Sequence, residues 1–186
     1  MKYLAWQIPA VLAVAAALCA QSVTALSASN IQCLINKELA PRQKRLFTHS
    51  PALAKLALQH SIHMAREERM TNERFPGESD LDKAANEIDP NNKVKNIGLG
   101  TLMGYKTDED IVRALKQSPG SFQAPPFDGS RTHFGIAFAR AEDGTLYTTY
   151  VTGIEPNAPE EKDECRQFAE LPIPTEKKSA KRAAAQ

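Results

Sequence analysis

The chain of 186 residues is poor in aromatic side chains, which make up 6% of it and include one tryptophan. The few aromatic residues are not interleaved with lysine and arginine, as they are in proteins that stack single-stranded nucleic acid. No charge of one sign is in excess, because 23 lysines and arginines stand against 22 aspartates and glutamates. We therefore expect no nucleic acid among the partners.

Long hydrophobic runs are also lacking. The apolar run at residues 10–20 is well short of the roughly 20 residues that a membrane-spanning helix needs. It follows Lys2 and precedes small residues, which is the pattern of a secretory signal peptide. We predict a signal peptide at residues 1–25, with cleavage after Ala20 as the alternative to cleavage after Ala25. The protein is then expected to be secreted to the extracellular space, with no transmembrane segment.

Cysteine is scarce, with three residues in the chain, and cleavage at the predicted site removes Cys19. Cys33 and Cys165 remain. A pair of cysteines in an exported protein favours a disulfide bond. On the chain-entropy model, closing so long a loop stabilises the fold by roughly 4–5 kcal/mol. The alternative, two unpaired thiols, stays open.

The motifs of several enzyme classes are missing. The chain has no Gly-x-Ser-x-Gly elbow of the kind that carries the nucleophile in many hydrolases. It also has no Gly-Lys-Ser/Thr ending of a phosphate-binding loop. We therefore expect no catalytic residues and no cofactor, and we retain a hydrolase with an unrecognised site only as a third hypothesis.

One cluster could hold a metal ion. His60, His63 and Glu67 follow one another at helical spacings and offer two imidazoles and a carboxylate. However, His60 lies on the same apolar stripe as Leu53 and Met64, and such a stripe packs against a core. His63 and Glu67, four residues apart, more simply form a surface ion pair. The pattern differs from His-Glu-x-x-His, so we expect no metal site.

Periodicity and capping signals predict an alternation of helices and strands. Helices are expected at 30–40, 51–69, 80–88 and 108–117, and extended segments at 94–104, 132–141 and 145–153. Ser50 and Pro51 mark the start of the longest helix. Asp143 and Gly144 mark a hairpin turn. This order predicts an α+β domain with helices against an antiparallel sheet.

Four segments resemble, in the same order, motifs of the CAP superfamily, also called the SCP domain. This family includes cysteine-rich secretory proteins, insect venom antigen five and plant pathogenesis-related-one proteins. An Ala-x-x-His-Ser-x-x-Met-Ala segment is matched by Ala57, His60, Ser61, Met64 and Ala65. Residues 95–100 resemble Glu-Asn-Ile-Ala-x-Gly, and residues 110–120 resemble a helix ending in Ser-Pro-Gly-His. Residues 132–153 resemble the closing hairpin, with His133 and Gly135 in its first strand.

The resemblance implies a CAP-type domain at residues 30–170, built as a three-layer helix–sheet–helix sandwich. His60 resembles the buried helix histidine of the family, a hydrogen-bonded core imidazole and not a ligand. Residues 171–186 follow as a separate segment with four basic residues, one acidic residue and no apolar face. We predict a disordered basic tail there.

Many family members line a central cleft with two histidines and two glutamates that bind a divalent metal. This chain departs from that pattern at all four positions, which are Asn72, Lys95, Ser118 and Ser121. A lysine in place of a carboxylate repels a cation. The resemblance therefore predicts a degenerate cleft with no metal and no catalysis.

For function, the resemblance implies a secreted, monomeric, non-catalytic binding protein. Some family members bind lipids, so a sterol or fatty acid in an apolar groove between helices is the first hypothesis. The alternative is a protein–protein interaction module, an effector or defence-related factor that binds an extracellular protein. The hydrolase is the third.

Overall fold

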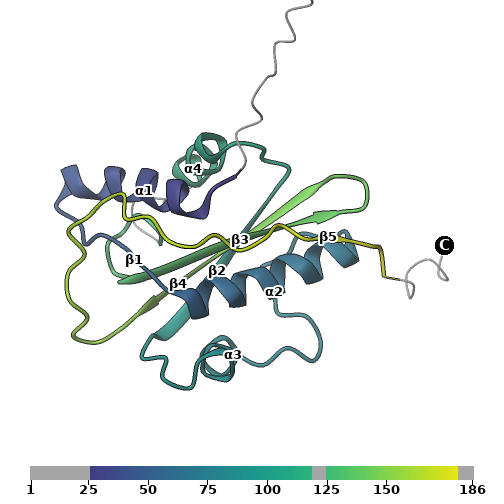
Figure 1. Ribbon diagram of the computed structural model, residues 1–186, viewed down its shortest axis with the longest axis horizontal. Helices are drawn as coiled ribbons and strands as arrows, with labels where there is room; N and C mark the ends of the chain where they lie inside the picture. Colours follow the sequence, from purple (N-terminus) through teal and green to yellow (C-terminus); the bar gives the residue numbers. More distant parts are fainter. Residues whose placement is uncertain (1–25, 119–124, 180–186) are drawn as a thin grey trace, which may run out of the picture.

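The computed structural model describes residues 26–118 and 125–179, and within them it confirms an α+β domain with one open sheet (Figure 1). The helices are α1 (Ala28–Leu39), α2 (Pro51–Glu67), α3 (Leu81–Ile88) and α4 (Asp108–Gln117), with a short 3-10 helix η1 (Ala40–Arg42) after α1. The strands are β1 (Thr48–His49), β2 (Lys95–Met103), β3 (His133–Ala141), β4 (Leu146–Ile154) and β5 (Thr175–Glu176). The predicted signal peptide and the last seven residues lie outside the described residues.

The three long strands form an antiparallel unit in the order β3-β4-β2. The β3–β4 hairpin turns at Gly144, whose φ of +88° favours glycine. The sheet as a whole is mixed, because β1 and β5 both pair in parallel with the free edge of β3. The expectation of a purely antiparallel sheet therefore holds for the long strands and is wrong for these two short ones.

Helices cover both faces of the sheet. Phe134, Ile136 and Phe138 alternate along β3 and pack into one core with α1 and α4. The residues between them, such as Ala137, contribute to a second core with α2 and α3. Figure 1 shows α1 and α4 on one side of the sheet and α2 and α3 on the other. Burial on both faces explains why β3 is a nearly continuous apolar strand, and the threonines of β4 are buried as well.

Helix α2 begins as the sequence predicts. The Ser50 hydroxyl accepts the N–H of Leu53 at 3.3 Å, and Pro51 occupies the first turn. The helix ends at Glu67, two residues before the expected end, because Glu68 adopts a left-handed conformation with φ of 48°. Among residues 26–118 and 125–179, no helix is long and apolar enough to cross a membrane.

Residues 171–179 are the described part of the predicted disordered tail, and they lie against the domain, whereas residues 180–186 lie outside the described residues. Residues 171–179 run along the edge of β3, where β5 pairs with it. Arg66 Nε lies 2.7 Å from Glu176 Oε2, and Lys178 Nζ lies 2.9 Å from Glu68 Oε2. The segment is ordered because backbone pairing at a sheet edge needs no apolar stripe, and because the end of α2 supplies complementary charges.

The residues just before this segment, from Cys165 to Glu170, are joined to α1. The predicted disulfide is confirmed, with the Cα atoms of Cys33 and Cys165 4.3 Å apart. Nearby, the Glu170 carboxylate accepts the backbone N–H groups of Ala28 and Ser29, each at 2.9 Å. These are helix-terminal N–H groups that have no partner within the helix, so Glu170 completes the cap of α1.

The cap makes a testable prediction about pH. Burial raises the pKa of Glu170, but hydrogen bonds from Ser29, Ser27 and Ala28 outweigh it and lower the pKa below its ordinary value. A carboxylate with a lowered folded-state pKa stabilises the fold above its unfolded-state pKa, and this contribution is lost as pH falls through the folded-state pKa. We expect Glu170→Ala to reduce the free energy of unfolding by about 1 kcal/mol at neutral pH, measured by urea denaturation.

Below a pH of about 4 the difference between Glu170→Ala and the wild-type protein should shrink, because the wild-type carboxyl is then also losing its charge. Glu160→Ala is the matched control, since Glu160 is an exposed glutamate of the same C-terminal region. An equal loss of stability for Glu170→Ala at pH 7 and at pH 3 would contradict a charge-dependent cap.

Candidate functional site

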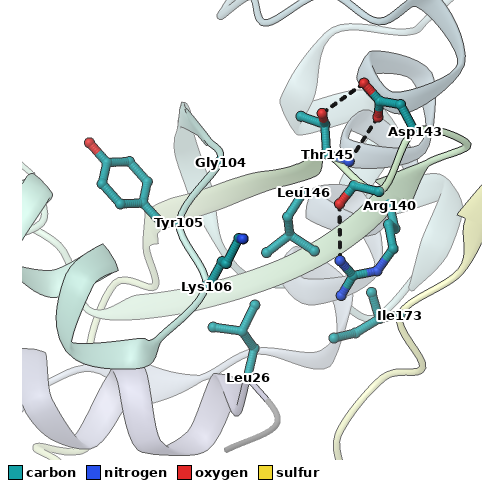
Figure 2. Close-up of a pocket in the computed structure, with 10 residues that line it drawn as sticks. Leu26, Gly104, Tyr105, Lys106, Arg140, Asp143, Thr145, Leu146 and Ile173 are labelled. Atoms are coloured by element: carbon teal, nitrogen blue, oxygen red, sulfur yellow. Dashed lines mark hydrogen bonds between the residues drawn. The ribbon is translucent and has the colours of Figure 1, made fainter. Parts of the chain in front are cut away.

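A cavity of about 710 Å³ lies at the hairpin end of the sheet (Figure 2). Four separate parts of the chain line it: the segment before α1, the turn after β2, the β3–β4 hairpin and the C-terminal segment. The lining residues are Leu26, Gly104, Tyr105, Lys106, Arg140, Asp143, Gly144, Thr145, Leu146 and Ile173. A volume of this size falls within the range of pockets that hold small organic molecules.

One wall of the cavity is apolar. Leu146 is buried and belongs to the core shared with α1 and α4, and Leu26 and Ile173 pack against the same core. Figure 2 shows these three side chains on the same side of the hairpin. They present aliphatic surface without a polar atom, so this wall suits a hydrocarbon group.

Two positively charged side chains also line the cavity, Lys106 and Arg140. Figure 2 shows the ammonium group of Lys106 and the guanidinium group of Arg140 on either side of Leu146. Arg140 Nη1 donates to Gly144 O at 3.0 Å, a contact that orients the guanidinium group across the hairpin. Within the part of the chain that the structure describes, neither Lys106 nor Arg140 forms a salt bridge. Both charges are therefore open to an anion.

The carboxylate in the cavity is engaged with its own turn. Asp143 accepts the backbone N–H of Thr145 at 2.8 Å and its hydroxyl at 2.9 Å. These hydrogen bonds lower the pKa of Asp143 below its ordinary value, so it is ionised at neutral pH. Asp143 thus shapes the hairpin through Thr145, and its one negative charge leaves the two positive charges of Lys106 and Arg140 in excess in the cavity.

His60 lies where a core imidazole is expected. Its side chain is fully buried, its Nε2 lies 2.9 Å from Thr71 O, and its ring lies 5.3 Å from the ring of Phe75. Its Nδ1 lies 3.5 Å from Glu78 Oε2. The imidazole thus fixes the loop that follows α2 against the helix.

His63 pairs with a residue that the sequence did not indicate. His63 Nδ1 lies 2.5 Å from Glu78 Oε1, and Arg74 Nε lies 3.1 Å from Glu78 Oε2. Burial raises the pKa of Glu78, but the hydrogen bond from Phe75 N–H, the charge of Arg74 and the nearby imidazole of His60 lower it below its ordinary value. Glu78 is a carboxylate that joins the loop to α2.

These side chains do not form a metal centre. In residues 26–118 and 125–179, no group of three or more histidine, cysteine, aspartate or glutamate side chains is placed to hold a metal ion. The guanidinium group of Arg74 beside Glu78 would also repel a cation.

The other family-motif residues hold the helices to the sheet. Ser61 is buried, and its Oγ lies 3.1 Å from Ala137 O and 2.9 Å from Thr149 Oγ1, so it joins α2 to β3 and β4. Met64 is fully buried on the same helix face. At Gly135 a Cβ atom would lie 2.3 Å from the backbone nitrogen of Ala54, which shows how closely β3 approaches α2.

His133 sits at the start of β3. Its Nε2 lies 3.2 Å from Glu155 Oε2, and its Nδ1 lies 2.8 Å from Thr132 Oγ1. Burial lowers the pKa of His133, and the Glu155 charge opposes this effect. The Thr132 hydroxyl also accepts the backbone N–H of Glu155 at 2.8 Å. The Thr132 hydroxyl is buried, and its contacts with His133 and Glu155 join the start of β3 to the residue after β4. We therefore interpret His133, Thr132 and Glu155 as a structural cluster.

The four degenerate cleft positions do not gather at the cavity. Ser121 lies outside the described residues. Each of the other three contacts a neighbour of its own: Asn72 Oδ1 accepts the Thr101 hydroxyl at 2.7 Å, Lys95 Nζ lies 3.4 Å from Asn86 Oδ1, and Ser118 Oγ lies 3.2 Å from Ala114 O. None of these three lines the 710 Å³ cavity.

Sequence reasoning missed Lys106 and Arg140, for which there was no local signal. Each is a single basic residue beside a turn, and 34 positions separate them. Only the pairing of β2 with β4 and of β3 with β4 brings the two turns to the same end of the sheet.

No family model and no curated protein sequence matches the chain. Among solved structures, the chain is similar to an outer surface protein from Borrelia burgdorferi, with a TM-score of 0.58 and 13% sequence identity. The match covers 68% of this chain and 91% of the Borrelia protein. At this identity the similarity concerns the fold alone, and it agrees with an α+β domain.

Proposed function

We propose that this protein is a secreted, non-catalytic binding protein of CAP type that holds an amphiphilic carboxylate, such as a fatty acid, in the 710 Å³ cavity. The observation that carries the proposal is an apolar wall flanked by two cations, Lys106 and Arg140, without salt-bridge partners among the described residues. A fatty acid supplies both complementary groups, a hydrocarbon chain for the wall and a carboxylate for the cations.

A sterol fits the same cavity less well. A neutral sterol would cover the apolar wall but would leave both cations without an anion. The cavity also lies beside the β3–β4 hairpin, whereas the resemblance implied a groove between helices. The fatty acid is therefore the better-supported ligand.

The CAP assignment and the secreted location belong to the same proposal. The close approach of Gly135 to α2 and the buried His60 support the CAP-type arrangement of three layers. The disulfide between Cys33 and Cys165 supports an oxidising compartment, because such bonds form and persist outside the reducing cytosol.

Charge reversal tests the ligand. We expect Lys106→Glu combined with Arg140→Glu to weaken binding of a fluorescent fatty acid at least about tenfold, because a carboxylate would then meet two like charges. A tenfold change corresponds to about 1.4 kcal/mol. The measurement is a fluorescence titration at physiological ionic strength.

Lys55→Glu is the matched control, because Lys55 is an exposed lysine of α2 that does not line the cavity. Equal affinity of the wild-type protein, the control and the double variant would contradict the assignment of the carboxylate to this cavity. Binding of a sterol that charge reversal leaves unchanged would favour the sterol hypothesis.

A further inference from the structure

The sheet ends at β2, a strand of nine residues whose outer side pairs with no other strand in the part of the chain that the structure describes. An unpaired edge presents a row of backbone N–H and C=O groups that can pair with another chain. Most proteins protect such an edge with charged side chains, proline or a covering loop.

The register identifies which backbone groups are free. Gly104 N–H donates to Leu146 O at 2.8 Å, one step beyond the pair formed by Met103 and Tyr147. In an antiparallel ladder, hydrogen-bonded pairs alternate with non-hydrogen-bonded pairs. Residues 98, 100 and 102 therefore point their N–H and C=O groups toward β4. The corresponding groups of Leu99, Thr101 and Met103 point away from the sheet.

The start of this edge is covered and the rest is open. Asp82 Oδ1 accepts the N–H of Ile97 at 3.1 Å, and Arg131 Nη1 donates to Asn96 O. Residues 96–105 contain no charged residue and no proline. Met103 is 45% exposed, which is unusual for a large apolar side chain in this structure. The Asn72 side chain contacts the Thr101 hydroxyl, but neither a charged side chain of the strand nor a proline protects the backbone groups of the segment from Leu99 to Met103.

We propose that this edge pairs, antiparallel, with the same edge of a second copy of the chain, about a two-fold axis at Thr101. In that register Thr101 faces its own equivalent, and Leu99 of each copy faces Met103 of the other. Every outward N–H and C=O group of Leu99, Thr101 and Met103 then finds a partner. The interface is isologous, as in most homodimers.

Charge and apolar surface select a second copy as the partner. Lys95 and Lys106 lie outside the paired segment, and the register sets Lys106 opposite Asn96, so no like charges face each other. Leu99 and Met103 lie on the same face of the strand. Pairing therefore places Leu99 of one copy beside Met103 of the second copy, and Met103 of the first copy beside Leu99 of the second. The exposed Met103 is thereby covered. This dimer departs from the monomer that the sequence led us to expect, and it does not depend on the ligand in the cavity.

Two cysteine variants test the register, each made with Cys19→Ser so that the new cysteine is the only one outside the native disulfide. At Thr101→Cys the two new residues form a directly opposed pair with Cα atoms about 5.5 Å apart, within disulfide reach. At Met103→Cys the two new residues are separated by about four positions along the ladder, or about 13 Å. Oxidised glutathione should therefore give a covalent dimer of Thr101→Cys and leave Met103→Cys as single chains on a non-reducing gel.

The second measurement is the average molar mass of the wild-type protein by light scattering at increasing protein concentration. We expect this mass to rise toward twice the mass of one chain. Thr101→Pro, which removes the central outward N–H, should keep the circular dichroism of the wild-type protein and give the single-chain mass. A wild-type protein of single-chain mass throughout, or equal cross-linking at positions 101 and 103, would overturn the proposal. The proposal would also be overturned if the wild-type protein stayed at the single-chain mass by itself and formed a heavier complex only with an added extended peptide, because the partner of the β2 edge would then not be a second copy.

Discussion

Replacing Cys33 and Cys165 together with alanine should lower the free energy of unfolding by roughly 4–5 kcal/mol, on the chain-entropy model. The bond links residues 132 positions apart, so removing it releases almost the whole domain as an open chain in the unfolded state. Cys33 is buried in α1, and alanine avoids placing a new hydroxyl group there. Urea denaturation of the double variant and of the wild-type protein gives the difference.

Reduction of the wild-type protein should reproduce the loss, and the double variant is the matched control, since it has no Cys33–Cys165 bond and reduction should leave its stability unchanged. Such a loss is a large fraction of the roughly 5–15 kcal/mol that stabilises a typical domain. If the double variant lost less than about 1 kcal/mol, the contacts of Glu170 with α1 would be sufficient to hold the C-terminal segment, and the disulfide would not be the main clamp.

The second large effect is expected at Gly135. Gly135→Ala should lower the free energy of unfolding by about 3 kcal/mol, because overpacking forces backbone shifts. The added Cβ atom would lie 2.3 Å from Ala54 N and 2.5 Å from Leu53 C. Both are backbone atoms of α2, so no side-chain rotation relieves the clash. Thermal or urea denaturation measures the loss.

Gly98→Ala is the matched control, because a Cβ atom at Gly98 in β2 would meet nothing within 4 Å. We expect this substitution to change stability by at most about 0.5 kcal/mol. Equal effects of Gly135→Ala and Gly98→Ala would show that α2 can move away from β3, contrary to the close packing described above.

Elements with local signals could be predicted from the sequence. Ser50, Pro51 and the apolar stripe indicated the start of α2, and Asp143 and Gly144 indicated the hairpin turn. These signals act within a few residues, so neither needs the rest of the fold. The disulfide followed from the number of cysteines that would remain after the predicted signal-peptide cleavage.

Elements that depend on distant partners could not be predicted. β1 and β5 are each two residues long and carry no periodicity, so they are defined only by the free edge of β3. Glu78 lies in a loop with many polar residues, and its role emerges only when the loop folds back on His60 and His63. Lys106 and Arg140 become a site only through the strand register.

The proposed function depends on occupation of the 710 Å³ cavity by an amphiphilic carboxylate. Native mass spectrometry of the protein secreted by its own producing cells tests this most directly. The wild-type protein should carry an extra mass that matches a fatty acid and that lipid extraction removes, and the Lys106→Glu, Arg140→Glu variant should lack it. A wild-type protein that shows only its bare mass before extraction would contradict the proposal.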